Sequence, residues 1–120
     1  MRRAAFALVM SLMLAPAALA GIDSCQEPYG PVLPDAATVT DVQLQAVKAD
    51  VLAFIRDSDA YQACLVAAMS EADKSKDGKM TDGQKAAVYR RIDASQKEKE
   101  AIGNEYNKLL GIVKSRAAKK

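Results

Sequence analysis

The chain has 120 residues, half of them hydrophobic, with four tyrosines, two phenylalanines, two cysteines and neither histidine nor tryptophan. This length allows one small domain with a single core. Without histidine there is no imidazole base and no imidazole metal ligand, which excludes much familiar catalysis, and a net charge of +2 marks neither a strongly basic nor a strongly acidic protein.

Residues 1–20 are predicted to be a signal peptide. Two arginines follow the first methionine, residues 4–15 form an apolar run, and Ala18-Leu19-Ala20 supplies the small residues that a signal peptidase needs. The apolar run is short for a spanning helix, so we expect cleavage before Gly21 rather than a retained anchor. The protein is therefore expected to be periplasmic or secreted, with no membrane span after the signal is removed.

The charges divide sharply along the rest of the chain. Residues 21–73 hold nine acidic residues against two basic ones, and residues 74–120 hold thirteen basic residues against six acidic ones. The halves therefore carry −7 and +7. Opposite signs favour pairing between the halves over nucleic-acid binding, because no aromatic residues alternate with the basic ones to form a binding groove.

Residues 21–39 are expected to form an extended arm. Pro28, Pro31 and Pro34 are spaced by three residues, which matches the three residues per turn of polyproline II. The same spacing occurs in ligands of proline-binding domains. An arm that packs on its own protein is the favoured interpretation, because Cys25 offers a tether.

The helical part, residues 40–120, opens with a first helix expected at about 41–72. Thr40, Asp41 and Gln43 have the types and spacing of a capping box with an acid in the first turn. Apolar or small residues then alternate at spacings of three and four, which predicts one continuous seam. The seam comprises Leu44, Val47, Val51, Phe54, Ser58, Tyr61, Leu65, Ala68 and Ala72.

A second helix is expected at about 82–114, after a second capping box at Thr81 to Gln84. Its seam is weaker in the middle and comprises Val88, Ile92, Ser95, Lys99, Ile102, Tyr106, Leu109 and Val113. The short connection predicts an all-α, antiparallel two-helix hairpin. Because so short a hairpin buries little on its own, self-association into a four-helix bundle is the expected consequence.

Cys25 and Cys64 are the only cysteines and are expected to form a disulfide in an oxidising compartment. An arm of this length can double back along the first helix to reach Cys64. Such a bond would stabilise the fold by about 3–4 kcal/mol in the chain-entropy model. A redox-active pair is the alternative, although the chain has no Cys-x-x-Cys motif.

Residues 73–84, between the helices, resemble the twelve-residue loop of EF-hand proteins. Oxygen-bearing residues and a central glycine have the spacing that calcium ligands need, but a glutamine stands where the family has a bidentate glutamate. The resemblance implies weak calcium binding, and an ordinary polar turn is the alternative. The candidate ligands are Asp73, Ser75, Asp77, Lys79, Thr81 and Gln84.

The wider chain resembles small exported proteobacterial proteins of uncharacterised function. The resemblance rests on the cysteine- and proline-bearing arm, the LPDAAT segment at residues 33–38, YQACL at residues 61–65 and NEYN at residues 104–107. It implies the plan of arm, disulfide and hairpin, and it supplies no activity.

The sequence points to a non-catalytic protein. It contains no glycine-rich phosphate loop, no nucleophile elbow and no cysteine with a histidine partner. Asp57 and Asp59 are expected on different helix faces, and Tyr61 and Tyr106 in the seams. We therefore expect a structural or interaction module without a cofactor, with a protein partner or a second copy as its ligand; a calcium-binding protein is the alternative.

Overall fold

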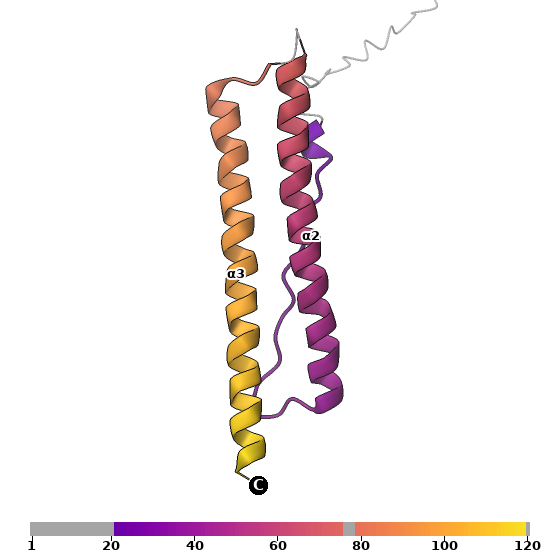
Figure 1. Cartoon of the computed structure of the whole chain (residues 1–120), viewed down its shortest axis with the longest axis vertical. Coiled ribbons are helices and arrows are strands. Elements are labelled where there is room, and N and C mark those ends of the chain that lie inside the picture. Colours follow the sequence, from indigo (N-terminus) through magenta and orange to yellow (C-terminus); the bar gives the residue numbers. More distant parts are fainter. Residues whose placement is uncertain (1–20, 76–78, 120) are drawn as a thin grey trace, which may run out of the picture.

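The computed structural model describes residues 21–75 and 79–119, and the predicted signal peptide lies outside these ranges. Two long helices, α2 (Asp41–Lys74) and α3 (Asp82–Ala118), make up most of the described chain, which contains no strand. They run side by side as a hairpin (Figure 1). The predicted all-α fold with one disulfide-tethered arm is confirmed.

Both helices begin at the predicted capping boxes. In α2 the Gln43 amide donates to Thr40 Oγ1 over 3.2 Å, and the Thr40 amide donates to Gln43 Oε1 over 2.9 Å. In α3, Thr81 and Gln84 repeat these bonds at 3.1 and 2.9 Å. Each box supplies hydrogen-bond partners for backbone amides that have none within the helix. At their C-terminal ends, α2 and α3 extend two and four residues beyond the positions expected from sequence.

Every residue of the predicted seams is buried or half-buried, between the helices or under the arm, where Ala68 lies against Gly21. Long-range side-chain contacts show the antiparallel direction, because a lower number in α2 pairs with a higher number in α3. These contacts join Asp73 to Lys85, Tyr61 to Arg91, and Asp59 to Lys99. Two of them are ion pairs between acids of α2 and lysines of α3, as the division of charge along the sequence predicts.

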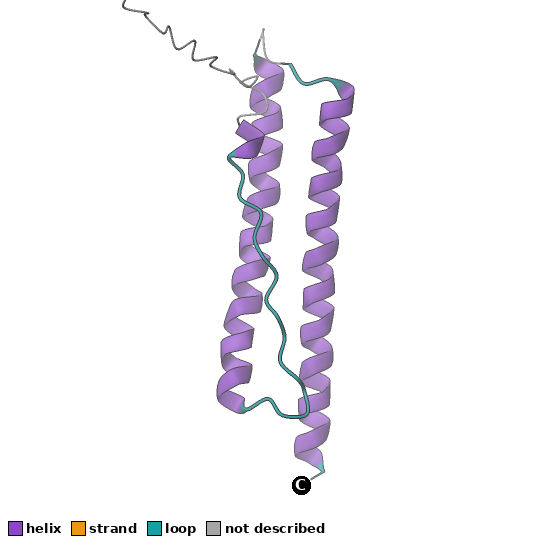
Figure 2. Ribbon diagram, turned by 180° about the vertical axis from the view of Figure 1, so that it is seen from behind, coloured by secondary structure: helices purple, strands orange, loops and turns teal. Residues whose placement is uncertain are grey.

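The arm, residues 21–39, follows the groove between the helices from the Cys64 level of α2 to its start at Asp41 (Figure 2). It lies against both helices, since Cys25 is bonded to α2 and Arg116 of α3 holds its other end. A Cβ on Gly30 would lie 3.1 Å from Glu98 Oε1 and 3.4 Å from Ile102 of α3. The arm is thus a third layer that closes one side of the hairpin, and the absence of a side chain at Gly30 lets its backbone approach α3.

Candidate functional site

The interhelical loop holds the candidate calcium ligands, and several of their oxygens already have partners. Asp73 Oδ1 lies 3.1 Å from Lys85 Nζ in an ion pair. Thr81 Oγ1 and Gln84 Oε1 accept the amide hydrogens of the second capping box. A calcium ion would have to displace these interactions to use the same atoms.

The remaining candidate ligands are less informative. Ser75 and Lys79 are exposed, and Asp77 lies outside the described residues. Within residues 21–75 and 79–119, no three histidine, cysteine or acidic side chains gather closely enough to hold a metal ion. Weak calcium binding and an ordinary polar turn both stay predictions for this loop.

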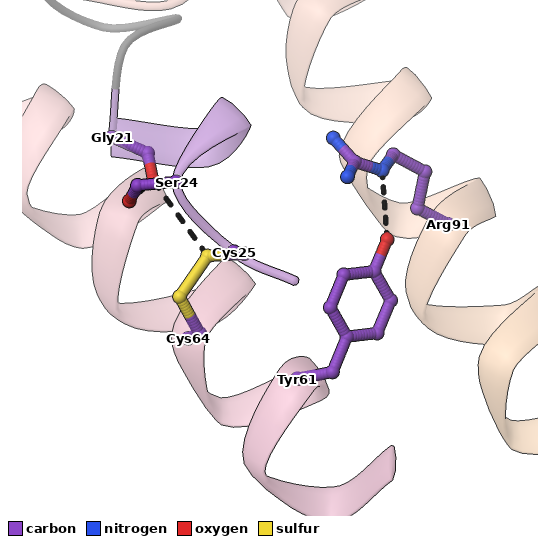
Figure 3. Close-up of a disulfide and its surroundings, with 6 residues drawn as sticks. All are labelled: Gly21, Ser24, Cys25, Tyr61, Cys64 and Arg91. Carbon is purple, nitrogen blue, oxygen red and sulfur yellow. Dashed lines mark hydrogen bonds between the residues drawn. A yellow bond between two sulfur atoms is a disulfide. The ribbon is translucent and has the colours of Figure 1, made fainter. Parts of the chain in front are cut away.

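The disulfide joins the arm to the half of α2 that is nearer the interhelical loop. Cys25 and Cys64 have their Cα atoms 5.7 Å apart and form the bond that was predicted from the sequence (Figure 3). Cys25 is buried, whereas Cys64 is half-buried on α2. Around the bond, the arm, both helices and the end of the loop share one apolar cluster of buried residues: Ile22, Cys25, Tyr61, Leu65, Met69, Ala72, Met80 and Val88.

Tyr61 and Arg91 form a polar contact across the helices beside this cluster (Figure 3). Arg91 Nε donates to Tyr61 Oη over 2.9 Å, and the guanidinium carbon lies 5.6 Å from the ring centroid. The tyrosine ring thus fills the core while its hydroxyl has a protein partner. The sequence indicated the buried ring but carried no signal for Arg91, because thirty residues separate the pair.

The weak middle of the second seam is a set of polar contacts. Gln62 Nε2 donates to Ser95 Oγ and to Gln96 Oε1, each over 3.3 Å. Lys99 Nζ lies 2.6 Å from Asp59 Oδ1 and is mostly shielded from solvent. The polar residues that interrupt the apolar pattern therefore connect the two helices.

A groove with an acidic rim runs beside the arm. Three open hollows of about 410, 240 and 450 Å³ all include Pro28 in their walls. Glu27, Asp57 and Glu98 contribute carboxylates to these walls, and Tyr29 stands 97% exposed among them. The hollows are shallow, so they mark a surface rather than an enclosed substrate site.

The C-terminal end of the arm is held by Arg116 of α3. Its two terminal nitrogens donate to the carbonyl oxygens of Ala36 and Val39 over 2.8 and 2.7 Å. The Val39 side chain is buried at the same place. The arm is therefore fixed at both ends, by the disulfide near its N-terminal end and by two hydrogen bonds from the Arg116 guanidinium at its C-terminal end.

Comparison with known protein families, curated proteins and solved structures finds no match for this chain. Of the helices that the structure describes, none is long and apolar enough to cross a membrane.

Proposed function

We propose that this protein is an exported, non-catalytic structural or interaction module that self-associates through one face of its hairpin. A disulfide is compatible with an oxidising compartment, and the leader-like first twenty residues support export. The acidic side chains Asp59 and Asp73 and the Tyr61 hydroxyl are engaged in contacts between the helices. These groups are used to join the helices, which supports a structural role for them.

The observation that carries this proposal is a set of exposed apolar residues on the side of the hairpin opposite the arm. Asp57 of α2 lines the hollows beside the arm. Asp59 lies about 200° further round the helix and pairs with Lys99 of α3. Asp59 therefore lies on the side of the hairpin opposite the arm. Leu52 and Val66 lie seven residues before and after Asp59 and share its face. Both are exposed, at 57% and 50%.

The matching face of α3 is marked by Gln96, which contacts Gln62 of α2. Tyr89 lies seven residues before Gln96 and is 58% exposed, and Gly103 lies seven residues after it. A Cβ on Gly103 would meet no atom within 4 Å. A glycine inside a helix costs about 1 kcal/mol relative to alanine, and close approach by another chain would account for this one. We call Leu52, Val66, Tyr89 and Gly103 the open face.

Charge at the rim of the open face favours a second copy as its partner. On α2, Lys48 and Arg56 stand one turn before and after Leu52. On α3, Asp93 and Glu100 stand one turn after Tyr89 and Gln96. Asp59 lies opposite Lys99, so a two-fold arrangement that lays α2 over the α3 of a second copy, with the axis along the helices, brings Arg56 and Glu100 to nearly the same height. The product is a four-helix bundle with the arms outside.

Light scattering on the chain from residue 21 onward, at tens of micromolar, tests this proposal. We expect a dimer, and we expect Val66→Glu to shift it to monomer because a carboxylate would be buried in the interface. Val42→Glu is the matched control, since Val42 is also exposed on α2 but lies in its first turn, where an acid is favourable. A strict monomer for the unmodified chain, or equal effects of the two variants, would contradict self-association through this face.

A further inference from the structure

We propose that residues 21–34, here called the strap, are a redox-released cover over one side of the hairpin. Reduction of the Cys25–Cys64 bond frees the strap while α2 and α3 stay paired. The inference does not rest on the proposed function, because the open face lies on the opposite side of the hairpin.

The strap is attached mainly at its N-terminal end. Ile22 and Cys25 are buried in the apolar cluster, and the disulfide joins them to α2. From residue 26 to residue 34, the structure shows no hydrogen bond from the strap to either helix. Half-buried prolines and the close approach of Gly30 to α3 are its contacts there. Without the disulfide, this segment would be held by packing alone.

The contact that holds the C-terminal end of the arm lies outside the strap and would remain after the strap is released. Arg116 holds the carbonyl oxygens of Ala36 and Val39, next to the start of α2. A one-turn bend follows Asp35, whose carbonyl accepts the amides of Thr38 and Val39. The strap can therefore swing about residues 34–35 while the chain below it keeps its place.

The hairpin has its own connections that do not use the strap. Asp59 pairs with Lys99, and Gln62 bonds to Ser95 and Gln96. Both helices keep their capping boxes. Release of the strap therefore removes one layer and leaves the helix pair intact, which is the behaviour of a locally unfolding unit.

The chemistry is an exchange with a dithiol. A thiolate of the dithiol attacks Cys64 Sγ, since Cys64 is the more exposed of the two cysteines. The S–S bond breaks, and Cys25 leaves as a thiolate that takes up a proton. The second thiol of the dithiol then attacks the mixed disulfide and releases Cys64, so two electrons and two protons pass to the protein and the dithiol becomes a disulfide.

Release uncovers apolar surface that the oxidised protein hides. Tyr61 and Leu65 of α2 share their buried cluster with Ile22 and Cys25 of the strap. When these two residues leave, the groove above Tyr61 and Leu65 opens to solvent. The oxidation state of one bond thus decides whether the hairpin presents an apolar groove on this side.

Limited proteolysis of the chain from residue 21 onward tests the inference, with dithiothreitol as the dithiol. Chymotrypsin cleaves after Tyr29, and fragment masses identify that bond. We expect cleavage there to accelerate about tenfold on reduction, because it follows the population of the released strap. The circular dichroism of the helices should stay nearly constant. The double variant Cys25→Ser with Cys64→Ser should behave like the reduced protein without any dithiol.

Tyr29→Ala is the control, since it removes this cleavage site in both states while Tyr29 contributes almost no burial. An unchanged cleavage rate at Tyr29 after full reduction would overturn the proposal, because the strap would then stay docked without its bond. Loss of helical signal together with faster cleavage would also overturn it, because the disulfide would then hold the whole fold. Light scattering on the same samples reports self-association separately.

Discussion

Replacing Ser58 by alanine is expected to stabilise this protein. Ser58 lies in the α2 seam and is 0% exposed, and its Oγ has no hydrogen-bond partner among the described residues. A buried polar group without a partner costs about 1–3 kcal/mol. Alanine also has a higher helix propensity than serine by about 0.5 kcal/mol. Since the vacated hydroxyl volume loses some packing, we expect the free energy of unfolding to rise by about 1–2 kcal/mol.

Ser95 is the matched control on the facing helix. It is also buried, at 4% exposed, but its Oγ accepts a hydrogen bond from Gln62 over 3.3 Å. Ser95→Ala gains the same helix propensity and loses this bond, whose net value is about 1 kcal/mol. We therefore expect a small decrease in stability, of about 0.5 kcal/mol, and an opposite sign for the two substitutions.

Urea unfolding of the oxidised chain, followed by circular dichroism, measures both changes on one scale. The two variants should keep the slope of the parent, so that the midpoints alone report stability. A lower midpoint for Ser58→Ala, or equal shifts for both serines, would refute the argument that Ser58 is buried without a partner.

Four further outcomes are expected. Leu65→Ala should lower the free energy of unfolding by about 3–5 kcal/mol in the same assay, because Leu65 is completely buried in the cluster around the disulfide. Arg116→Ala should lower it by about 1–3 kcal/mol, since two charged hydrogen bonds to the arm are lost. The hydrogen bond to Asp93 raises the pKa of Lys97 above its ordinary 10.5, so the contact stabilises the folded protein below pH 10.5 and is lost as the pH rises through the raised pKa. Asp93→Asn should therefore lower the pKa of Lys97, which NMR titration measures. Millimolar calcium should leave the melting temperature unchanged, because oxygens of residues 73–84 are already engaged, and a rise would instead support calcium binding.

The helices could be predicted from sequence because their signals are local. Thr40 and Gln43 are three residues apart, and the seam repeats every three or four residues. The disulfide followed from the number of cysteines and the expected compartment. Each of these features depends on a short stretch of chain or on composition, and each is present in the structure.

The contacts that position the arm could not be predicted in the same way. Arg116 binds Val39 across 77 residues, and Arg91 binds Tyr61 across 30. No spacing rule connects such pairs, since they depend on which side of the hairpin the arm takes. That side is decided by the direction of Cys64 on α2 together with the room left by Gly30 beside α3.

The polar residues in the middle of the seams explain how a two-helix hairpin keeps a single register. A purely apolar heptad seam tolerates a shift of seven residues, because apolar side chains pack on one another in many alignments. A shift of α3 by one heptad would place Ile92 or Tyr106 opposite Asp59 and leave Lys99 half-buried without its carboxylate. Gln62 would lose Ser95 and Gln96 at the same time. Because a half-buried lysine without its carboxylate and an unpaired Gln62 both raise the free energy of the shifted hairpin, these polar contacts favour one alignment, and that alignment brings Arg116 to the arm.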